Sequence, residues 1–212
     1  MNLYLFCKRS ARTLKKHSPA MSDTSNLSRF SDTSVLCRGE RFEVYIDRDG
    51  IRRRVGEIGE EISLHYAGKN PVLIGVLHGA CMFLADLLRV LTIDCEVDFR
   101  RLSSYEEGKT SSGQIIEREG VVRIDLRGRH VVVVEDIVDT GLTMAYLMER
   151  IMERQPASLR IATLLHKPEA ARVHVPLEYI GFRAPNRFLI GYGMDYEQTG
   201  RHLPEIYIQA EG

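Results

Sequence analysis

The 212-residue chain has no excess of either charge, because 29 lysines and arginines balance 29 aspartates and glutamates. General binders of nucleic acid or of membrane surfaces need a basic excess, so neither partner is expected. An apolar run long enough to span a bilayer is also missing. The four cysteines never occur as C-x-x-C, which leaves zinc and redox motifs unsupported and indicates free thiols in a reducing compartment.

Acidic residues are missing from the chain before Asp23, whereas five lysines and arginines precede it. Serine and threonine then become frequent between residues 22 and 34. We therefore expect residues 1–34 to be a disordered N-terminal extension and residues 35–212 to form a single domain. A cytoplasmic location is expected, with two alternatives for the extension: an organelle-targeting peptide, or a true translation start at Met21.

From Val35 onward, helical patterns alternate with apolar strand patterns. Helical spacing of apolar residues predicts helices over 55–66, 82–91 and 142–152. Apolar runs or strict alternation predict strands over 72–77, 95–102, 131–134, 159–165, 177–182 and 188–192. This order indicates an α/β domain with a mostly parallel central sheet and helices on both faces. Residues 103–114 lack periodicity and are rich in serine and glycine, which predicts a mobile loop.

Three carboxylates follow the run of four valines at 131–134, namely Glu135, Asp136 and Asp139. In parallel α/β sheets, ligands bind beyond the carboxyl ends of the strands. The turn 139–143 then opens a helix, where backbone N–H groups and threonine hydroxyls suit a phosphate. Adjacent carboxylates suit ribose hydroxyls or Mg²⁺, so the segment suits a ribose 5-phosphate. The alternative is that these acids only favour the helix dipole.

This segment, VVVVEDIVDTGLT, resembles the phosphoribosyl-pyrophosphate loop of the phosphoribosyltransferase family, and of its hypoxanthine-guanine subgroup in particular. Four further segments resemble that family in the same order: VLHGACMFLADL (76–87), SSY (103–105), LLHKP (164–168) and FLIGYGMDY (188–196). The resemblance implies the type I phosphoribosyltransferase fold. That fold has a mostly parallel central sheet flanked by helices and a small hood built from the N- and C-terminal segments.

The activity that the resemblance implies is purine salvage. A 5-phosphoribosyl group would pass from phosphoribosyl pyrophosphate to N9 of hypoxanthine or guanine, giving IMP or GMP and pyrophosphate, with Mg²⁺ as cofactor. The implied partners are these small molecules and further copies of the chain, in a homodimer or homotetramer. Two other readings compete: a phosphoribosyltransferase for xanthine or a pyrimidine, and an RNA-binding regulator that retains the fold. The neutral charge disfavours the regulator.

The resemblance also implies a role for each matching position. The phosphoribosyl group would be held by Glu135, Asp136, Asp139, Thr140, Gly141, Leu142 and Thr143. The catalytic base that accepts the N7 proton would be Asp139. Pyrophosphate would be bound by His78, Gly79 and Arg201, with a cis peptide before His78. The purine would be bound by Lys167, Phe188, Leu189 and Asp195. The lid would carry Ser104 and Tyr105. Mg²⁺ would be bound by Glu135, Asp136 and Asp195.

Structural readings compete with several of these roles. Apart from the motif, Asp139 would be a helix cap, Lys167 a solvated lysine at a strand end and Phe188 a core aromatic. His78 stands where many family members have lysine or arginine, and Leu142 replaces a lysine found in some. Backbone N–H groups are therefore expected to make the contacts at both positions. The basic run at 52–54 would spread around a helix axis or form a subunit contact.

Overall fold

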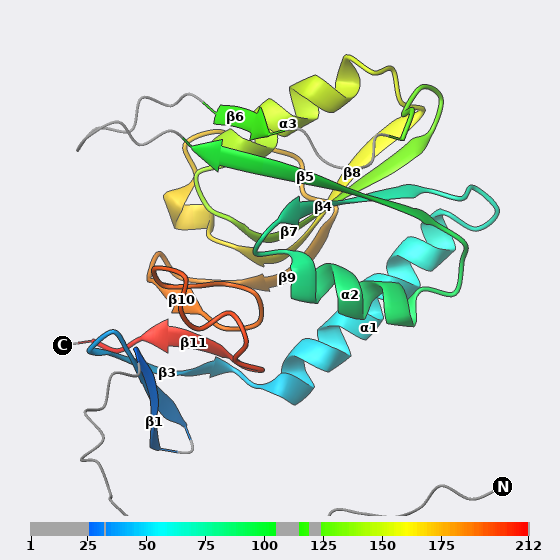
Figure 1. The fold of residues 1–212 in the computed structure, drawn as a ribbon. Coiled ribbons are helices and arrows are strands. Elements are labelled where there is room, and N and C mark those ends of the chain that lie inside the picture. The colour runs from blue at the N-terminus through cyan, green and yellow to red at the C-terminus, as the bar shows by residue number, and fades with distance from the viewer. Residues whose placement is uncertain (1–25, 32, 105–114, 119–123, 212) are drawn as a thin grey trace, which may run out of the picture.

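The computed structural model describes residues 26–31, 33–104, 115–118 and 124–211 of the chain. Its larger sheet has six strands in the order β6-β5-β4-β7-β8-β9 (Figure 1). In chain order the strands are β4 (Val72–Leu77), β5 (Glu96–Ser104), β6 (Ile115–Arg118), β7 (His130–Val138), β8 (Ser158–His166) and β9 (Tyr179–Arg183). All neighbours pair in parallel except β5 and β6, which are antiparallel. The predicted parallel sheet is confirmed.

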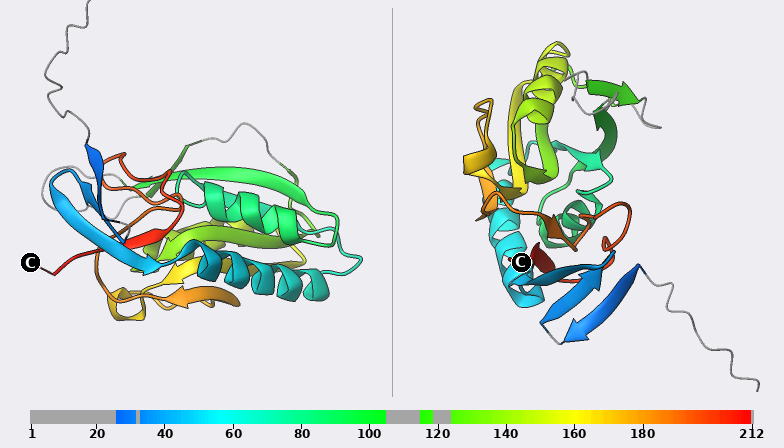
Figure 2. Two further views of the ribbon diagram at one scale, coloured as in Figure 1. Left: turned by 90° about the horizontal axis from the view of Figure 1, so that it is seen from below. Right: turned by 90° about the vertical axis from the view of Figure 1, so that its left-hand side faces the viewer.

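Helices cover both faces of this sheet (Figures 1 and 2). On one face lie α1 (Arg48–His65) and α2 (Cys81–Val90), and on the other lies α3 (Leu142–Met152). The valine run shows why both faces are apolar, since Val132 and Val134 join the core cluster with α1 and α2. Val131 and Val133 join the cluster under α3. A strand buried on both faces needs such a continuous apolar run, because successive side chains point to opposite sides.

The hood is a separate antiparallel sheet in the order β1-β2-β3-β11-β10, and it lies beside the large sheet (Figure 2). Its strands are β1 (Leu27–Ser31), β2 (Ser34–Cys37), β3 (Glu40–Ile46), β10 (Leu189–Ile190) and β11 (Ile206–Gln209). N- and C-terminal segments therefore build it together, as the family resemblance implied. The predicted extension over 1–34 was too long, because β1 and the start of β2 belong to this sheet. Residues 1–25 of that extension lie outside the described residues.

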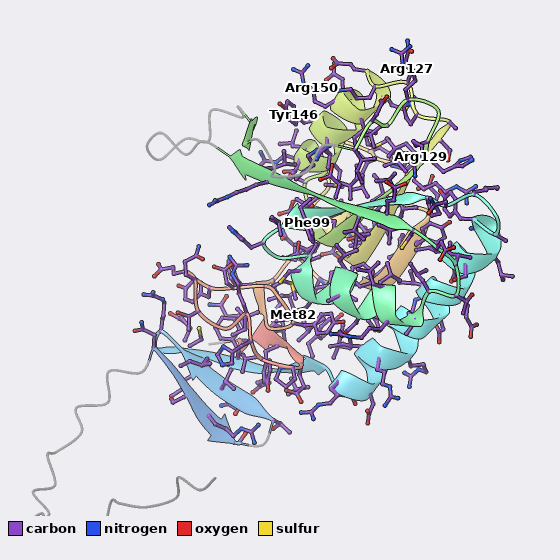
Figure 3. All side chains as sticks on the ribbon, turned by 45° about the vertical axis from the view of Figure 1, so that its right-hand side comes forward. Met82, Phe99, Arg127, Arg129, Tyr146 and Arg150 are labelled. Carbon is purple, nitrogen blue, oxygen red and sulfur yellow. The ribbon has the colours of Figure 1, made fainter. Side chains whose placement is uncertain are left out.

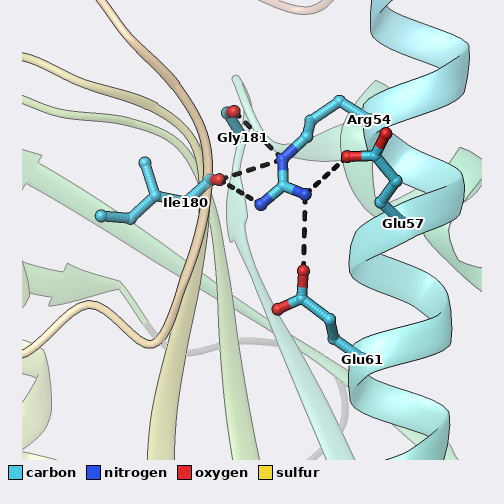
Figure 4. A network of polar contacts seen from close by, with 5 residues as sticks. All are labelled: Arg54, Glu57, Glu61, Ile180 and Gly181. Atoms are coloured by element: carbon cyan, nitrogen blue, oxygen red, sulfur yellow. Dashed lines mark hydrogen bonds and ion pairs between the residues drawn. The ribbon is translucent and has the colours of Figure 1, made fainter.

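The basic run at 52–54 has one member that is used inside the fold (Figure 4). Arg54 donates through Nη2 to the carbonyl oxygen of Ile180 at 2.8 Å and through Nε to that of Gly181 at 3.2 Å. It also pairs with Glu57 and Glu61 of its own helix. Since β9 is an edge strand, its outer carbonyl groups would otherwise need solvent. Arg54 thus joins α1 to the sheet edge and is not free for a subunit contact.

The first two residues of the predicted mobile loop belong to a strand, and residues 105–114 lie outside the described residues. Strand β5 continues through Ser104, two residues into the predicted loop, and pairs there with β6. Tyr105, the other predicted lid residue, lies outside the described residues. Within the described ranges, no helix combines the length and the apolarity that crossing a bilayer requires.

Candidate active site

The acidic pair lies within a strand, not beyond its end as the sequence predicted. Strand β7 runs on to Val138 and stays paired with β8 over that length. Its pairing with β4 stops at Val134, opposite Gly75. Glu135 and Asp136 therefore lie where β4 has separated from β7, so the carboxyl edge of the sheet is open on that side. This opening is a polar cavity of about 220 Å³, bordered by the acids and by the turns that follow β4 and β7.

Glu135 is a buried carboxylate next to a second one. Its side chain accepts a hydrogen bond from the Asp136 N–H at 3.1 Å, and only 6 % of the residue is exposed. Burial raises the pKa of Glu135 well above its usual range, and the neighbouring charge of Asp136 raises it further. Ionising Glu135 is therefore costly. Ribose hydroxyl donors or a divalent cation would recover that cost, so the pair favours such a ligand.

The turn after β7 leaves its helix N-terminus free for an anion. Thr140 donates its backbone N–H to Oδ1 of Asp139. The residue before α3 is Gly141, at φ 78°, and no side chain caps the helix there. A side chain at Gly141 would overlap the carbonyl oxygen of Val173, so only glycine fits. The reading of Asp139 as a helix cap is therefore wrong. The first N–H groups of α3 suit a phosphate, and Thr143 borders the same cavity.

The turn after β4 packs directly against the acidic pair. It contains the cis peptide bond between Leu77 and His78 that the resemblance implied. A Cβ at Gly79 would overlap the carboxylate of Asp136, so the backbone of this turn approaches that side chain as only glycine allows. The side chain of His78 is exposed. The predicted pyrophosphate turn and the predicted ribose-binding acids therefore border one cavity.

The loop between β10 and β11 (191–205), called the hood loop below, contacts the same turn. A Cβ at Gly193 would overlap the carbonyl oxygen of Gly79, so the two backbones touch. Arg201 donates to the carbonyl of Gly193 at 2.8 Å and pairs with Asp195 at 2.7 Å. The Gln198 N–H occupies the other oxygen of Asp195 at 2.7 Å. Arg201 and Asp195 thus lie on the loop that contacts the pyrophosphate turn, but they form an ion pair with each other. Binding of pyrophosphate and a cation would require them to exchange partners.

The predicted purine-binding residues come from the end of β8 and from the hood. Lys167 follows that strand and is half-buried, and its N–H donates to the carbonyl of Val138 at 2.9 Å. Burial lowers the pKa of its ammonium group, and the nearby Asp139 charge opposes this shift. Phe188 is 45 % exposed and meets the ring of Tyr196 edge-on at 5.1 Å. The reading of Phe188 as a core aromatic is therefore wrong. Leu189 is buried in β10.

One contact of the hood loop was not singled out from the sequence. Tyr192 donates through Oη to Oδ2 of Asp86 in α2 at 2.7 Å, and Tyr192 is buried. Its φ of 49° places it in the left-handed region, between two glycines that share this conformation. The sequence G-Y-G was a signal of an unusual turn, but its partner 106 residues away was not readable. This bond ties the loop that carries Asp195 and Arg201 to the helix that follows the pyrophosphate turn.

We expect Tyr192→Phe to raise the KM for phosphoribosyl pyrophosphate several-fold with little change in kcat. The free energy of unfolding should fall by about 0.5–1.5 kcal/mol, because Asp86 is half-exposed and keeps Arg89 as a partner. Tyr207→Phe is the matched control, since it removes a tyrosine–carboxylate bond of 3.0 Å to Glu205 in the hood sheet. It should cost similar stability and leave KM unchanged in steady-state assays. Equal KM values in both variants would refute the positioning role.

Carboxylate oxygens are available for Mg²⁺, but no complete metal site is preformed. Among the described residues, no group of three or more histidine, cysteine, aspartate or glutamate side chains is arranged to hold a metal ion. Mg²⁺ commonly binds through one or two carboxylates and completes its shell with water and substrate oxygens. Glu135 and Asp136 supply such a pair beside the cavity, and Asp195 supplies a third carboxylate on the hood loop. The residues fit the ion in that mode.

Comparisons with known proteins agree with this geometry. A family model described as a phosphoribosyl transferase domain matches residues 46–197. The hypoxanthine-guanine phosphoribosyltransferase of Streptococcus pneumoniae is 42% identical over 169 residues, which cover 80% of this chain and 93% of that protein. The hypoxanthine phosphoribosyltransferase of Escherichia coli is 43% identical over 166 residues, covering 77% and 93%. A crystal structure of a hypoxanthine-guanine phosphoribosyltransferase from Bacillus anthracis superimposes with a TM-score of 0.74 at 34% identity, covering 79% and 98%.

Proposed function

The chain belongs to the phosphoribosyltransferase family, and we propose that it is a purine-salvage enzyme of the hypoxanthine-guanine type. It transfers 5-phosphoribosyl from phosphoribosyl pyrophosphate to N9 of hypoxanthine or guanine and releases pyrophosphate. One observation carries this proposal beyond the resemblance. Gly79 touches both the Asp136 carboxylate and the Gly193 backbone, so the segments for ribose, pyrophosphate and purine meet at one point.

The substrate would be held from three sides. The N–H groups at the start of α3, with Thr140 and Thr143, bind the 5-phosphate, and the exposed Leu142 leaves that contact to the backbone. Glu135 and Asp136 accept hydrogen bonds from the ribose hydroxyls. The backbone of His78 and Gly79 faces the pyrophosphate, and Arg201 supplies a planar fork for its oxygens. Mg²⁺, when bound, neutralises charge on the pyrophosphate leaving group.

Acid–base chemistry would centre on Asp139 and Lys167. Asp139 is exposed at the cavity and accepts the N7 proton of the purine as N9 bonds to C1 of the ribose. The carboxylates nearby also suit the positive charge that develops on the sugar. Lys167 donates to the 6-oxo group, and Phe188 offers an exposed ring face for stacking. Its neighbour Leu189 contributes backbone groups from β10.

We expect Lys167→Ala to weaken selection for 6-oxo purines. An ammonium group is only a donor, so it favours the 6-oxo group over the 6-amino group of adenine. The ratio of kcat/KM for hypoxanthine to that for adenine should fall by about tenfold or more, because a hydrogen bond to a charged group is worth roughly 1.5–3 kcal/mol. Lys69→Ala is the control, since Lys69 bonds to His65 in the turn after α1. An unchanged ratio in Lys167→Ala would assign the 6-position to another group.

A homodimer or homotetramer is part of the proposal. Met82 and Phe99 are 40 % exposed each, so both offer apolar surface to a second copy. They lie on α2 and β5 (Figure 3), Met82 at the start of the helix that follows the pyrophosphate turn and Phe99 opposite Gly75 of β4. A second copy that covered them would border the active site.

The direct test of the proposed function is product identification. The purified chain, incubated with hypoxanthine, phosphoribosyl pyrophosphate and Mg²⁺, should form IMP and pyrophosphate in equal amounts, as chromatography of the mixture would measure. Hydrolysis to ribose 5-phosphate without IMP would reject transfer to the base.

A further inference from the structure

A second cavity lies behind the phosphate turn, on the α3 side of the large sheet. Its volume is about 290 Å³, and the ends of β7, β8 and β9 line it together with the connection 168–177. Val138 and Val175 in its wall belong to the core cluster under α3. Ile137 and Leu165 pack into the cluster on the opposite face, with α1 and α2. This cavity and the active-site cavity share Val138 and Asp139, and their other lining residues differ.

Three nitrogen-bearing side chains line this cavity: His166, His174 and Arg183. The Nδ1 atom of His166 is buried and has no hydrogen-bond partner among the described residues. Among the residues that the structure describes, neither the His174 ring nor the Arg183 guanidinium has a hydrogen bond or an ion pair. All three side chains line the same cavity, where His174 and Arg183 are exposed. Burial lowers the pKa of His166, and the charges of Arg183 and His174 lower it further.

A buried polar atom without a partner is rare and calls for a water, an ion or a ligand. The one acid at this cavity is Asp139, and its carboxylate already accepts the Thr140 N–H. The surplus of donors over acceptors favours an anion. Guanidinium and imidazole groups are common partners of phosphate oxygens, and the guanidinium can donate through two nitrogens at once.

We propose that His166, His174 and Arg183 form a second anion site, which takes a phosphate group, either free or carried by a nucleotide. The site lies behind the segment that supports the phosphate turn. In the connection 168–177, the N–H groups of Arg172 and Val173 both donate to the carbonyl of Thr140 at 3.0 Å. A ligand in the second site would therefore contact the support of the catalytic turn. The binding itself does not depend on the proposed reaction.

The test is a titration of the full chain with inorganic phosphate, followed by NMR of labelled histidine rings and backbone amides. The rings of His166 and His174 should shift saturably, and in Arg183→Gln their apparent Kd should rise at least tenfold. Arg127→Gln, at an exposed position beyond the far end of β7, is the control and should keep the Kd (Figure 3). The Gly79 and Thr143 amides report the active-site cavity, which those two residues line without lining the second one, and their shifts should persist in Arg183→Gln.

Each outcome decides one proposal. No saturable ring shift, or the same Kd in Arg183→Gln, means an adventitious ion only and overturns the second site. Missing shifts at the Gly79 and Thr143 amides with normal ring shifts would instead count against the proposed function. A repeat with ATP identifies the source of the phosphate group. Tighter ring-detected binding than with phosphate assigns a nucleotide, and weaker or equal binding assigns free phosphate.

Discussion

Asp139→Asn should lower kcat by roughly 10²–10⁴-fold, the usual contribution of general acid–base catalysis. Asparagine keeps the size of the side chain and an acceptor for the Thr140 N–H, but it cannot take a proton from the purine. The affinity for phosphoribosyl pyrophosphate should change little, because the N–H groups of α3 and the acidic pair remain. Steady-state kcat and calorimetric binding of phosphoribosyl pyrophosphate measure the two quantities separately.

Asp125→Asn is the matched control for this variant. Asp125 is also an exposed turn aspartate, and its carboxylate accepts the Arg127 N–H at 3.1 Å. The control should retain full kcat. If Asp139→Asn also retained kcat, the base would have to be another group or water. A loss of substrate affinity with kcat unchanged would make Asp139 a binding residue only.

Gly79→Ala should raise the KM for phosphoribosyl pyrophosphate by at least tenfold and lower kcat as well. The added Cβ would overlap the carboxylate of Asp136, so either that side chain or the pyrophosphate turn must move. Because the overlapping atoms belong to a side chain that can turn away, the free energy of unfolding should change far less than activity. Chemical denaturation and steady-state kinetics on the same preparation compare the two effects.

Gly56→Ala provides the control for the added methyl group. Gly56 lies within α1, and a Cβ there meets no atom within 4 Å. Alanine should stabilise the helix by roughly 0.5–1 kcal/mol and leave the kinetics unchanged. Unchanged kinetics in Gly79→Ala would show that the close approach of this turn to Asp136 has no role in substrate binding.

The sequence predicted the large sheet well, because its strands carry strong local patterns. The run at 72–77 matched β4 residue for residue, and the valine run placed the central strand β7. The hood was predicted only through the family resemblance. Its strands are short, and β3 pairs with β11 from the other end of the chain, which no local pattern reveals. The predicted extension over 1–34 was too long for the same reason, because β1 forms by pairing with β2 and has no apolar periodicity that would predict it.

The sequence predicted which residues belong to the site, but it did not predict how they are arranged. Strand β7 keeps its pairing with β8 beyond Val134 while β4 leaves, so the acidic pair lies inside a strand. The point at which β4 stops pairing with β7 depends on the turn after β4, not on the acidic segment itself. The pairing of Asp195 with Arg201 was likewise unreadable, because each residue had been assigned a separate ligand. In the structure these opposite charges lie 2.7 Å apart and attract each other.

The most direct test of the central claim is a comparison of bases under one set of conditions. Hypoxanthine, guanine, xanthine, adenine and uracil would each be incubated with the chain, phosphoribosyl pyrophosphate and Mg²⁺, and nucleotide formation would be measured with and without a metal chelator. We expect turnover of hypoxanthine or guanine, lost in the presence of the chelator, and much lower kcat/KM for adenine and uracil. Turnover of uracil without turnover of purines, or no turnover of any base, would contradict the assignment.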